Sequence, residues 1–106
     1  MAWLLLVLAG LFEIVWAVGL KLSDGFSRPI PSLWTIAAML ISFSLLGVSM
    51  KTLPVGTAYG VWVGIGTVGT VIVGAIMFGE PASVLRMVFV VLIVIGIVGL
   101  KLTSPA

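Results

Sequence analysis

Four long apolar runs dominate the sequence, and each is about as long as a helix that crosses a lipid bilayer. Such a helix needs roughly 20 mostly apolar residues, because the hydrocarbon core is ~30 Å thick. The runs cover about residues 3–20, 32–50, 55–78 and 82–100, and short segments with proline, glycine or charge separate them. The runs do not alternate with polar residues, which argues against a transmembrane β-barrel. We therefore expect residues 1–106 to form a single transmembrane domain, an all-α membrane protein with four helices.

Composition excludes several classes of protein. Charged residues make up 8% of the chain, whereas soluble domains average about 25%. The chain has no Cys and no His, which removes thiol chemistry and histidine-based acid–base catalysis. Its five basic residues are scattered and form no stripe that would follow a phosphate backbone. We expect no enzyme, no metal or cofactor and no nucleic-acid partner, and we expect the surroundings to be a lipid bilayer.

The basic residues are divided almost evenly between the two sides of the membrane. With four spans, Lys51, Lys101 and the N-terminal amine share one side, and Lys21, Arg28 and Arg86 share the other. The orientation of a membrane protein normally follows an excess of Lys and Arg on the cytoplasmic side. A nearly even division therefore favours neither orientation of the chain in the membrane. It predicts that copies insert both ways and pair as an antiparallel homodimer, similar to the inverted repeats of larger transporters. The alternative is that a difference of so few charges carries no meaning.

One acidic residue, Glu13, lies inside an apolar run. It is about ten residues into the first run, which at 1.5 Å per residue places it near the centre of the bilayer. An ionisable group at that depth costs about 2.5–3.5 kcal/mol even on insertion scales, and such groups usually mark ion or proton paths. A protonated carboxyl that only bonds a neighbouring helix is the alternative. We favour a functional site at Glu13.

A few polar and aromatic residues accompany Glu13 at depth. Trp16 lies one turn after Glu13 and carries an N–H donor that could hold a carboxylate in place. Ser42 lies midway along the second run, and Tyr59 and Trp62 share one face of the third. The alternatives are a bond from Ser42 to a carbonyl of its own helix and plain core packing of the aromatic rings. We expect Trp16, Ser42, Tyr59 and Trp62 to line a site around Glu13.

Small residues recur every four positions in the third run. The two rows are Gly56, Gly60, Gly64 and Gly66, Thr70, Gly74. Rows of this kind let helices approach closely. The Gly64-Ile65-Gly66 segment also weakens the middle of the helix, so we expect a hinge at Gly64 and Gly66. Gly96 and Gly99, in a fourth run rich in Val and Ile, suit a helix–helix contact between two copies or ordinary packing.

An ordered set of short segments gives the chain a resemblance to a known family. The segments are Phe12-Glu13, Ser23-Asp24-Gly25-Phe26 followed by Pro31-Ser32, Gly56-Thr57-Ala58-Tyr59-Gly60-Val61-Trp62, Gly64-Ile65-Gly66 and Phe78-Gly79-Glu80-Pro81. In these the chain resembles the small multidrug resistance family, four-helix exporters that work as antiparallel dimers. One branch of the family exports bulky aromatic and quaternary ammonium cations, and another exports guanidinium. Trp16, Lys51-Thr52-Leu53-Pro54 and Glu80-Pro81 resemble the guanidinium branch.

The resemblance implies a function and a mechanism. It implies a proton-coupled antiporter in the bacterial inner membrane that exports guanidinium or small guanidinyl cations by alternating access. Paired Glu13 residues would bind protons and substrate competitively, and the residues matching Trp16, Ser42, Tyr59 and Trp62 would line or orient the site. Gly60 stands where the family usually has Ala. The alternatives are a polyspecific multidrug exporter, an uncoupled channel or proton pore, and a structural subunit of a larger complex or one half of an obligate heterodimer.

Overall fold

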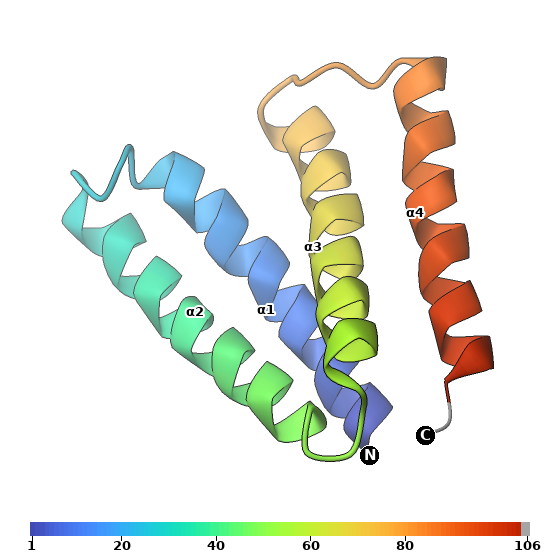
Figure 1. The fold of residues 1–106 in the computed structure, drawn as a ribbon. Coiled ribbons are helices and arrows are strands. Elements are labelled where there is room, and N and C mark those ends of the chain that lie inside the picture. Colours follow the sequence, from blue (N-terminus) through green and yellow to red (C-terminus); the bar gives the residue numbers. More distant parts are fainter. Residues whose placement is uncertain (105–106) are drawn as a thin grey trace.

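The computed structural model of the chain describes residues 1–104, and that part of the chain consists of four α-helices and their connections (Figure 1). The helices are α1 (Ala2–Leu22), α2 (Pro29–Ser49), α3 (Val55–Met77) and α4 (Val84–Thr103). All four are long and apolar enough to cross a membrane, and residues 1–104 contain no strand. The prediction of an all-helical chain with four membrane-spanning helices is confirmed.

Two helices begin at least two residues away from the starts expected from the apolar runs. Helix α2 begins at Pro29 rather than at residue 32, and takes Pro29 and Pro31 into its first turn. Proline is tolerated there because the N–H groups of a first turn have no partner within the helix. Helix α4 begins at Val84 rather than at residue 82, and the Ser83 hydroxyl caps it by accepting a bond from the backbone N–H of Arg86 at 3.3 Å.

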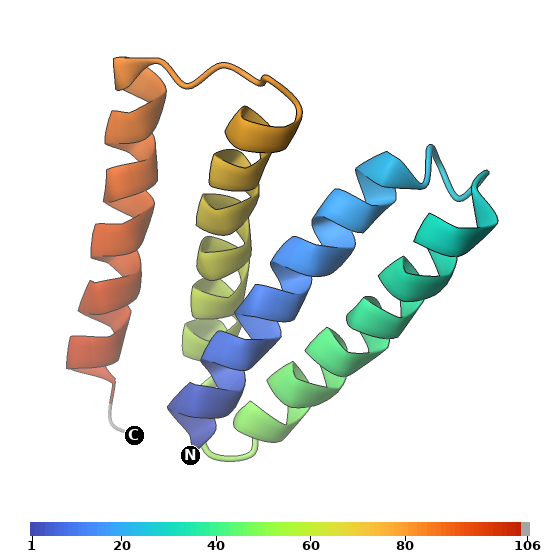
Figure 2. The same ribbon diagram turned by 180° about the vertical axis from the view of Figure 1, so that it is seen from behind.

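The helices lie nearly in one layer rather than in a closed bundle. The Cα atoms extend over 43 × 34 × 16 Å, so the chain is thin in one direction. Helix α1 packs between α2 and α3, and α4 packs mainly on α3, with the Lys101 Nζ of α4 4.9 Å from the centre of the Trp3 ring of α1 (Figures 1 and 2). Within Val84–Thr103 no residue is buried. The pair α1 and α3 therefore forms the middle of the layer.

The two rows of small residues in α3 face different neighbours. A Cβ at Gly64 would come within 2.8 Å of the Ile97 side chain of α4, and one at Gly66 would overlap the carboxyl group of Glu13 in α1. Gly64 thus allows α4 to approach, and Gly66 allows α1 to approach, as close helix packing requires. Helix α3 continues unbroken through Gly64 and Gly66, so the hinge at these glycines stays a prediction.

An ion pair joins the far end of α1 to the α3–α4 connection. The two helices diverge toward the α3–α4 connection (Figures 1 and 2). There the Lys21 Nζ lies 2.7 Å from the Glu80 Oε2 and 4.7 Å from the centre of the Phe78 ring. Both ionic side chains are exposed, and such a pair contributes about 0–1 kcal/mol. Its place matters more than its strength, because it links α1 to the α3–α4 connection where the helices have separated.

The close approach of α1 and α2 at Gly19 gives a test of the fold. A Cβ at this position would overlap the hydroxyl of fully buried Thr35 and come within 2.8 Å of the Trp34 ring. Overpacking costs about 1–3 kcal/mol, against a helix-propensity gain of about 0.5–1 kcal/mol. We expect Gly19→Ala to lower the thermal unfolding midpoint of the detergent-solubilised protein. The matched control is Gly47→Ala, where the space is open, and it should not lower the midpoint; an equal midpoint for both variants would contradict this packing.

Candidate functional site

Glu13 lies near the middle of α1 and turns toward α3. The residue is half-buried, and its Oε1 atom is buried without a hydrogen-bond partner anywhere in residues 1–104. Gly66 of α3 packs directly on the carboxyl group, and only glycine leaves room for it there. An unpartnered carboxyl at this depth is costly, and residues of this kind in membrane proteins mark binding sites or ion paths.

A hollow of about 280 Å³ lies beside the carboxyl group, between α1 and α3. Its lining residues are Glu13 and Ala17 of α1 with Gly66, Thr67, Thr70 and Val71 of α3. A water molecule takes about 30 Å³ of liquid volume, so the hollow has room for a small ion together with some water. None of the lining residues, all within the described part of the chain, is basic. Chemically, the arrangement offers an anionic group to a proton or to a small cation.

A second polar cluster fastens α2 and α3 to α1. The indole N–H of Trp62 donates to the hydroxyl of Ser42 at 2.9 Å, and that hydroxyl donates to the backbone carbonyl of Ala9 at 2.7 Å. Ser42 and Ala9 are fully buried, and Trp62 is 7% exposed. The hydroxyl bonds to a carbonyl of the neighbouring helix, not to one of its own helix. Because a serine has one hydroxyl hydrogen, Ser42 cannot donate to a carboxylate while this bond persists.

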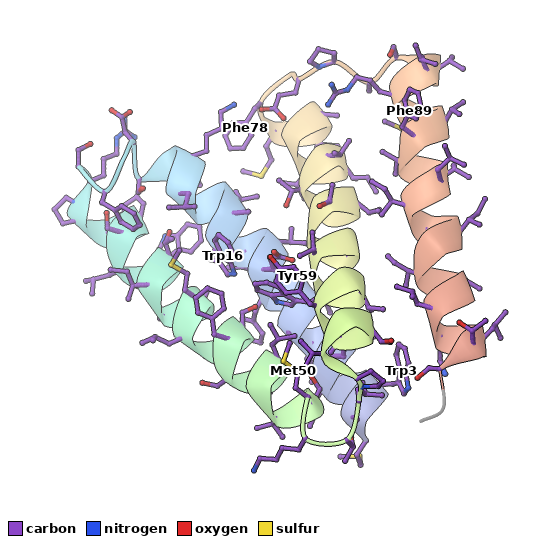
Figure 3. The ribbon with its side chains drawn as sticks, viewed as in Figure 1. Trp3, Trp16, Met50, Tyr59, Phe78 and Phe89 are labelled. Atoms are coloured by element: carbon purple, nitrogen blue, oxygen red, sulfur yellow. The ribbon has the colours of Figure 1, made fainter. Side chains whose placement is uncertain are left out.

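Aromatic rings continue from this cluster across three helices. Phe43 packs edge-on against Trp62 and against Trp16, with ring centres 5.7 and 6.0 Å apart, and Tyr59 packs on Trp62 at 5.8 Å. Trp16 and Tyr59, labelled in Figure 3, form the two ends of this row. Tyr59 is 55% exposed, so its ring is available to a neighbouring molecule.

The structure brings four of the predicted site residues together, without a hydrogen bond to the Glu13 carboxyl group. Ser42, Tyr59, Trp62 and Trp16 join through direct contacts or through Phe43. Within residues 1–104, none of them makes a hydrogen bond to Glu13. The predicted role of these residues in orienting the carboxyl group therefore stays a prediction.

Helix geometry explains why Trp16 and Glu13 face different neighbours. A side chain three residues further along a helix points about 60° to one side of the first side chain, and a side chain four residues further points about 40° to the other side. Ala17, four residues after Glu13, lines the same hollow. Trp16, three residues after Glu13, packs against Phe43 of α2, and its N–H has no partner in the described chain.

Sequence reasoning missed Thr67 and did not recognise Thr70 as a site residue. Both line the hollow beside Glu13, whereas Thr70 was expected only as a member of a packing row. One turn separates Thr70 from Gly66, the residue that packs on the carboxyl group. That spacing is visible in the sequence, but the face of α3 that meets α1 is set by packing and is not.

The Trp62–Ser42 bond predicts a measurable coupling. In Ser42→Ala the Trp62 N–H remains buried without an acceptor, which costs about 1–3 kcal/mol. In Trp62→Phe the donor itself is absent, so adding Ser42→Ala should cost less. We expect a coupling energy of about 0.6–1.7 kcal/mol, the range for hydrogen bonds between membrane helices. Circular dichroism of the purified variants during denaturation measures it, and additivity within about 0.3 kcal/mol would contradict the bond.

Comparison with known proteins agrees with this architecture over almost the whole chain. The family model described as Small Multidrug Resistance protein matches residues 1–93. The chain is 56% identical over 104 residues to the guanidinium exporter of Escherichia coli (strain K12), an alignment that covers 98% of this chain and 99% of that protein. It is 58% identical over 104 residues to the guanidinium exporter of Salmonella typhimurium (strain LT2), with 98% and 99% covered. It is 56% identical over 104 residues to the guanidinium exporter of Proteus vulgaris, an alignment that covers 98% of this chain and 100% of that protein.

The four apolar helices and the bacterial relatives identify a multi-pass protein of the bacterial inner membrane. The family model covers most of the chain, and the relatives align with it from end to end. On both grounds, the chain belongs to the small multidrug resistance family.

Proposed function

We propose that the protein is a proton-coupled antiporter that exports guanidinium or small guanidinyl cations. The observation that supports this most is Glu13, a carboxyl group in the middle of a membrane helix with a buried, unpartnered oxygen beside a hollow. The relatives named as guanidinium exporters support the choice of cation.

The chemistry of the carboxyl group suits exchange. A guanidinium ion is planar and permanently charged, and it presents paired N–H groups that match the two oxygens of a carboxylate. A proton occupies the same oxygens. Because a bare carboxylate in hydrocarbon is costly, Glu13 is stable when it holds either a proton or the cation, and unstable when it holds neither. Proton entry on one side of the membrane therefore releases the cation on that side.

A second, oppositely oriented copy completes the proposed transporter. Helix α4 has no buried residue within Val84–Thr103, and the space beside Gly96 and Gly99 is open, which suits packing against another membrane helix. An antiparallel homodimer would have two Glu13 carboxyl groups near the midplane and two equivalent, inverted conformations. We propose two protons exchanged for each cation, because both carboxyl groups must be emptied.

The remaining predicted residues have supporting roles in this proposal. Trp16, Ser42, Tyr59 and Trp62 form the wall of the site, where the Ser42–Trp62 bond fixes one ring and exposed Tyr59 faces the partner. Gly64 and Gly66 let α3 bend as the dimer exchanges its two conformations.

Removal of the acidic group tests the proposal. In proteoliposomes with an acidic interior, we expect the protein to take up external guanidinium and to release protons. Glu13→Gln keeps the size of the side chain but cannot hold a proton and a cation in turn, so exchange should fall at least about tenfold, as loss of a charged hydrogen-bonding partner implies. Asp24→Asn, a matched change in the α1–α2 connection, should keep exchange. A Glu13→Gln variant that still exchanges protons for guanidinium would refute the assignment.

The same vesicles separate the alternatives. A guanidinium exporter prefers guanidinium and methylguanidinium, whereas a polyspecific exporter also transports a tetraaryl cation. An uncoupled pore would pass guanidinium with no linked proton movement. Activity of the purified single chain excludes an obligate heterodimer.

Dual insertion is tested with single cysteines, because the natural chain has none. Thr52 and Ala82 lie in exposed connections at opposite ends of α3. If copies insert both ways, a membrane-impermeant thiol reagent added to intact cells should label about half of Thr52→Cys and about half of Ala82→Cys, as the near-even charge count predicts. Full labelling of one variant and none of the other would show a single orientation.

A further inference from the structure

The hollow beside Glu13 contains a second buried polar atom without a partner, the hydroxyl oxygen of Thr70. Threonine in a helix commonly bonds back to a carbonyl one turn earlier. Thr67 does so with the Val63 carbonyl, and Thr103 does so with the Gly99 carbonyl, each at 2.7 Å. Thr70 makes no such bond within the described chain. The hydrogen-bonding capacity of its hydroxyl is therefore unused in the described chain, in a residue that lines the hollow.

A guanidinium ion at Glu13 would need such an acceptor. All its polar hydrogens are donors, and one carboxylate accepts from only one edge of the ion. The indoles of Trp16 and Trp62 cannot help, because an indole N–H is a donor only. The Ser42 hydroxyl is already bonded to Ala9 and Trp62. Among the hydroxyls that line the hollow, only that of Thr70 is both buried and unpartnered within residues 1–104.

We propose that Thr70 is a substrate-contacting residue that determines specificity. Its hydroxyl accepts a hydrogen bond from an N–H group of the guanidinium ion held by Glu13. The proposal rests on the proposed function and names a further residue of the same site. A cation without N–H groups would occupy the hollow and leave this buried hydroxyl unpaired. Sites built to hydrogen-bond a substrate discriminate strongly against analogues that lack the matching group. Thr70 thus favours guanidinium over quaternary ammonium ions.

The experiment replaces the hydroxyl and keeps the shape. In reconstituted protein with a pH gradient, Thr70→Val should raise the KM for guanidinium about tenfold, the effect of one lost hydrogen bond to a charged group. The maximal rate should change by less than about twofold, because the carboxyl chemistry is intact. Thr70→Ser, which retains the hydroxyl, should restore the KM. Thr103→Val makes the same change on α4, away from the hollow, and should leave the KM unchanged.

Each other result overturns the assignment of Thr70. An unchanged KM in Thr70→Val, with guanidinium exchange intact, would refute Thr70 as a contact and leave the proposed function standing. An equal rise in Thr67→Val would mean that general polarity of the hollow matters and not this hydroxyl. A loss of maximal rate that Thr70→Ser does not restore would show a structural role. If the unaltered protein transports no guanidinium, the proposed function fails and the assignment of Thr70 fails with it.

Discussion

A carboxyl group held in hydrocarbon without a hydrogen-bond partner is the constraint on which the site depends. The penalty for Glu13, about 2.5–3.5 kcal/mol or more, is not offset by any hydrogen bond or ion pair within residues 1–104. The neighbouring helix instead makes space, with Gly66 packed on the carboxyl group and a hollow beyond it. A fold that carries this penalty and leaves room beside it favours a ligand that neutralises the charge.

Two neighbouring levels of the α1–α3 contact differ in how they are bonded. At Ala9, the chain of hydrogen bonds from Trp62 through Ser42 to the Ala9 carbonyl fastens three helices together. One helical turn further along α1, the Glu13 oxygen and the Thr70 hydroxyl have no partner in the described chain. A hydrogen bond between membrane helices gives modest stability but fixes geometry. The bonded level can therefore hold α1 in register while the contacts at Glu13 change with the ligand.

The sequence was sufficient to predict the helices and the acidic group, and insufficient to predict which residues surround that group. Four apolar runs predict four helices because rise per residue and bilayer thickness fix the length, and Glu13 is conspicuous as a charge at depth. The starts at Pro29 and Val84 depend on first-turn prolines and on the Ser83 cap, which hydropathy does not measure. The partners of Trp16 and Thr70 depend on how α1 and α3 are rotated, which the close fit of Gly66 to Glu13 sets.

The flatness of the chain supports the proposal that two copies form the exporter. A layer 16 Å thick, measured on Cα atoms, leaves the α1–α3 hollow without a third wall. Between apolar helices in lipid there is no hydrophobic driving force, so close packing at small residues has to supply the association. The open space beside Gly96 and Gly99 on α4 offers such a contact. In the proposed antiparallel dimer a second layer would supply the missing wall, and its inverted orientation would make the inward- and outward-facing states equivalent.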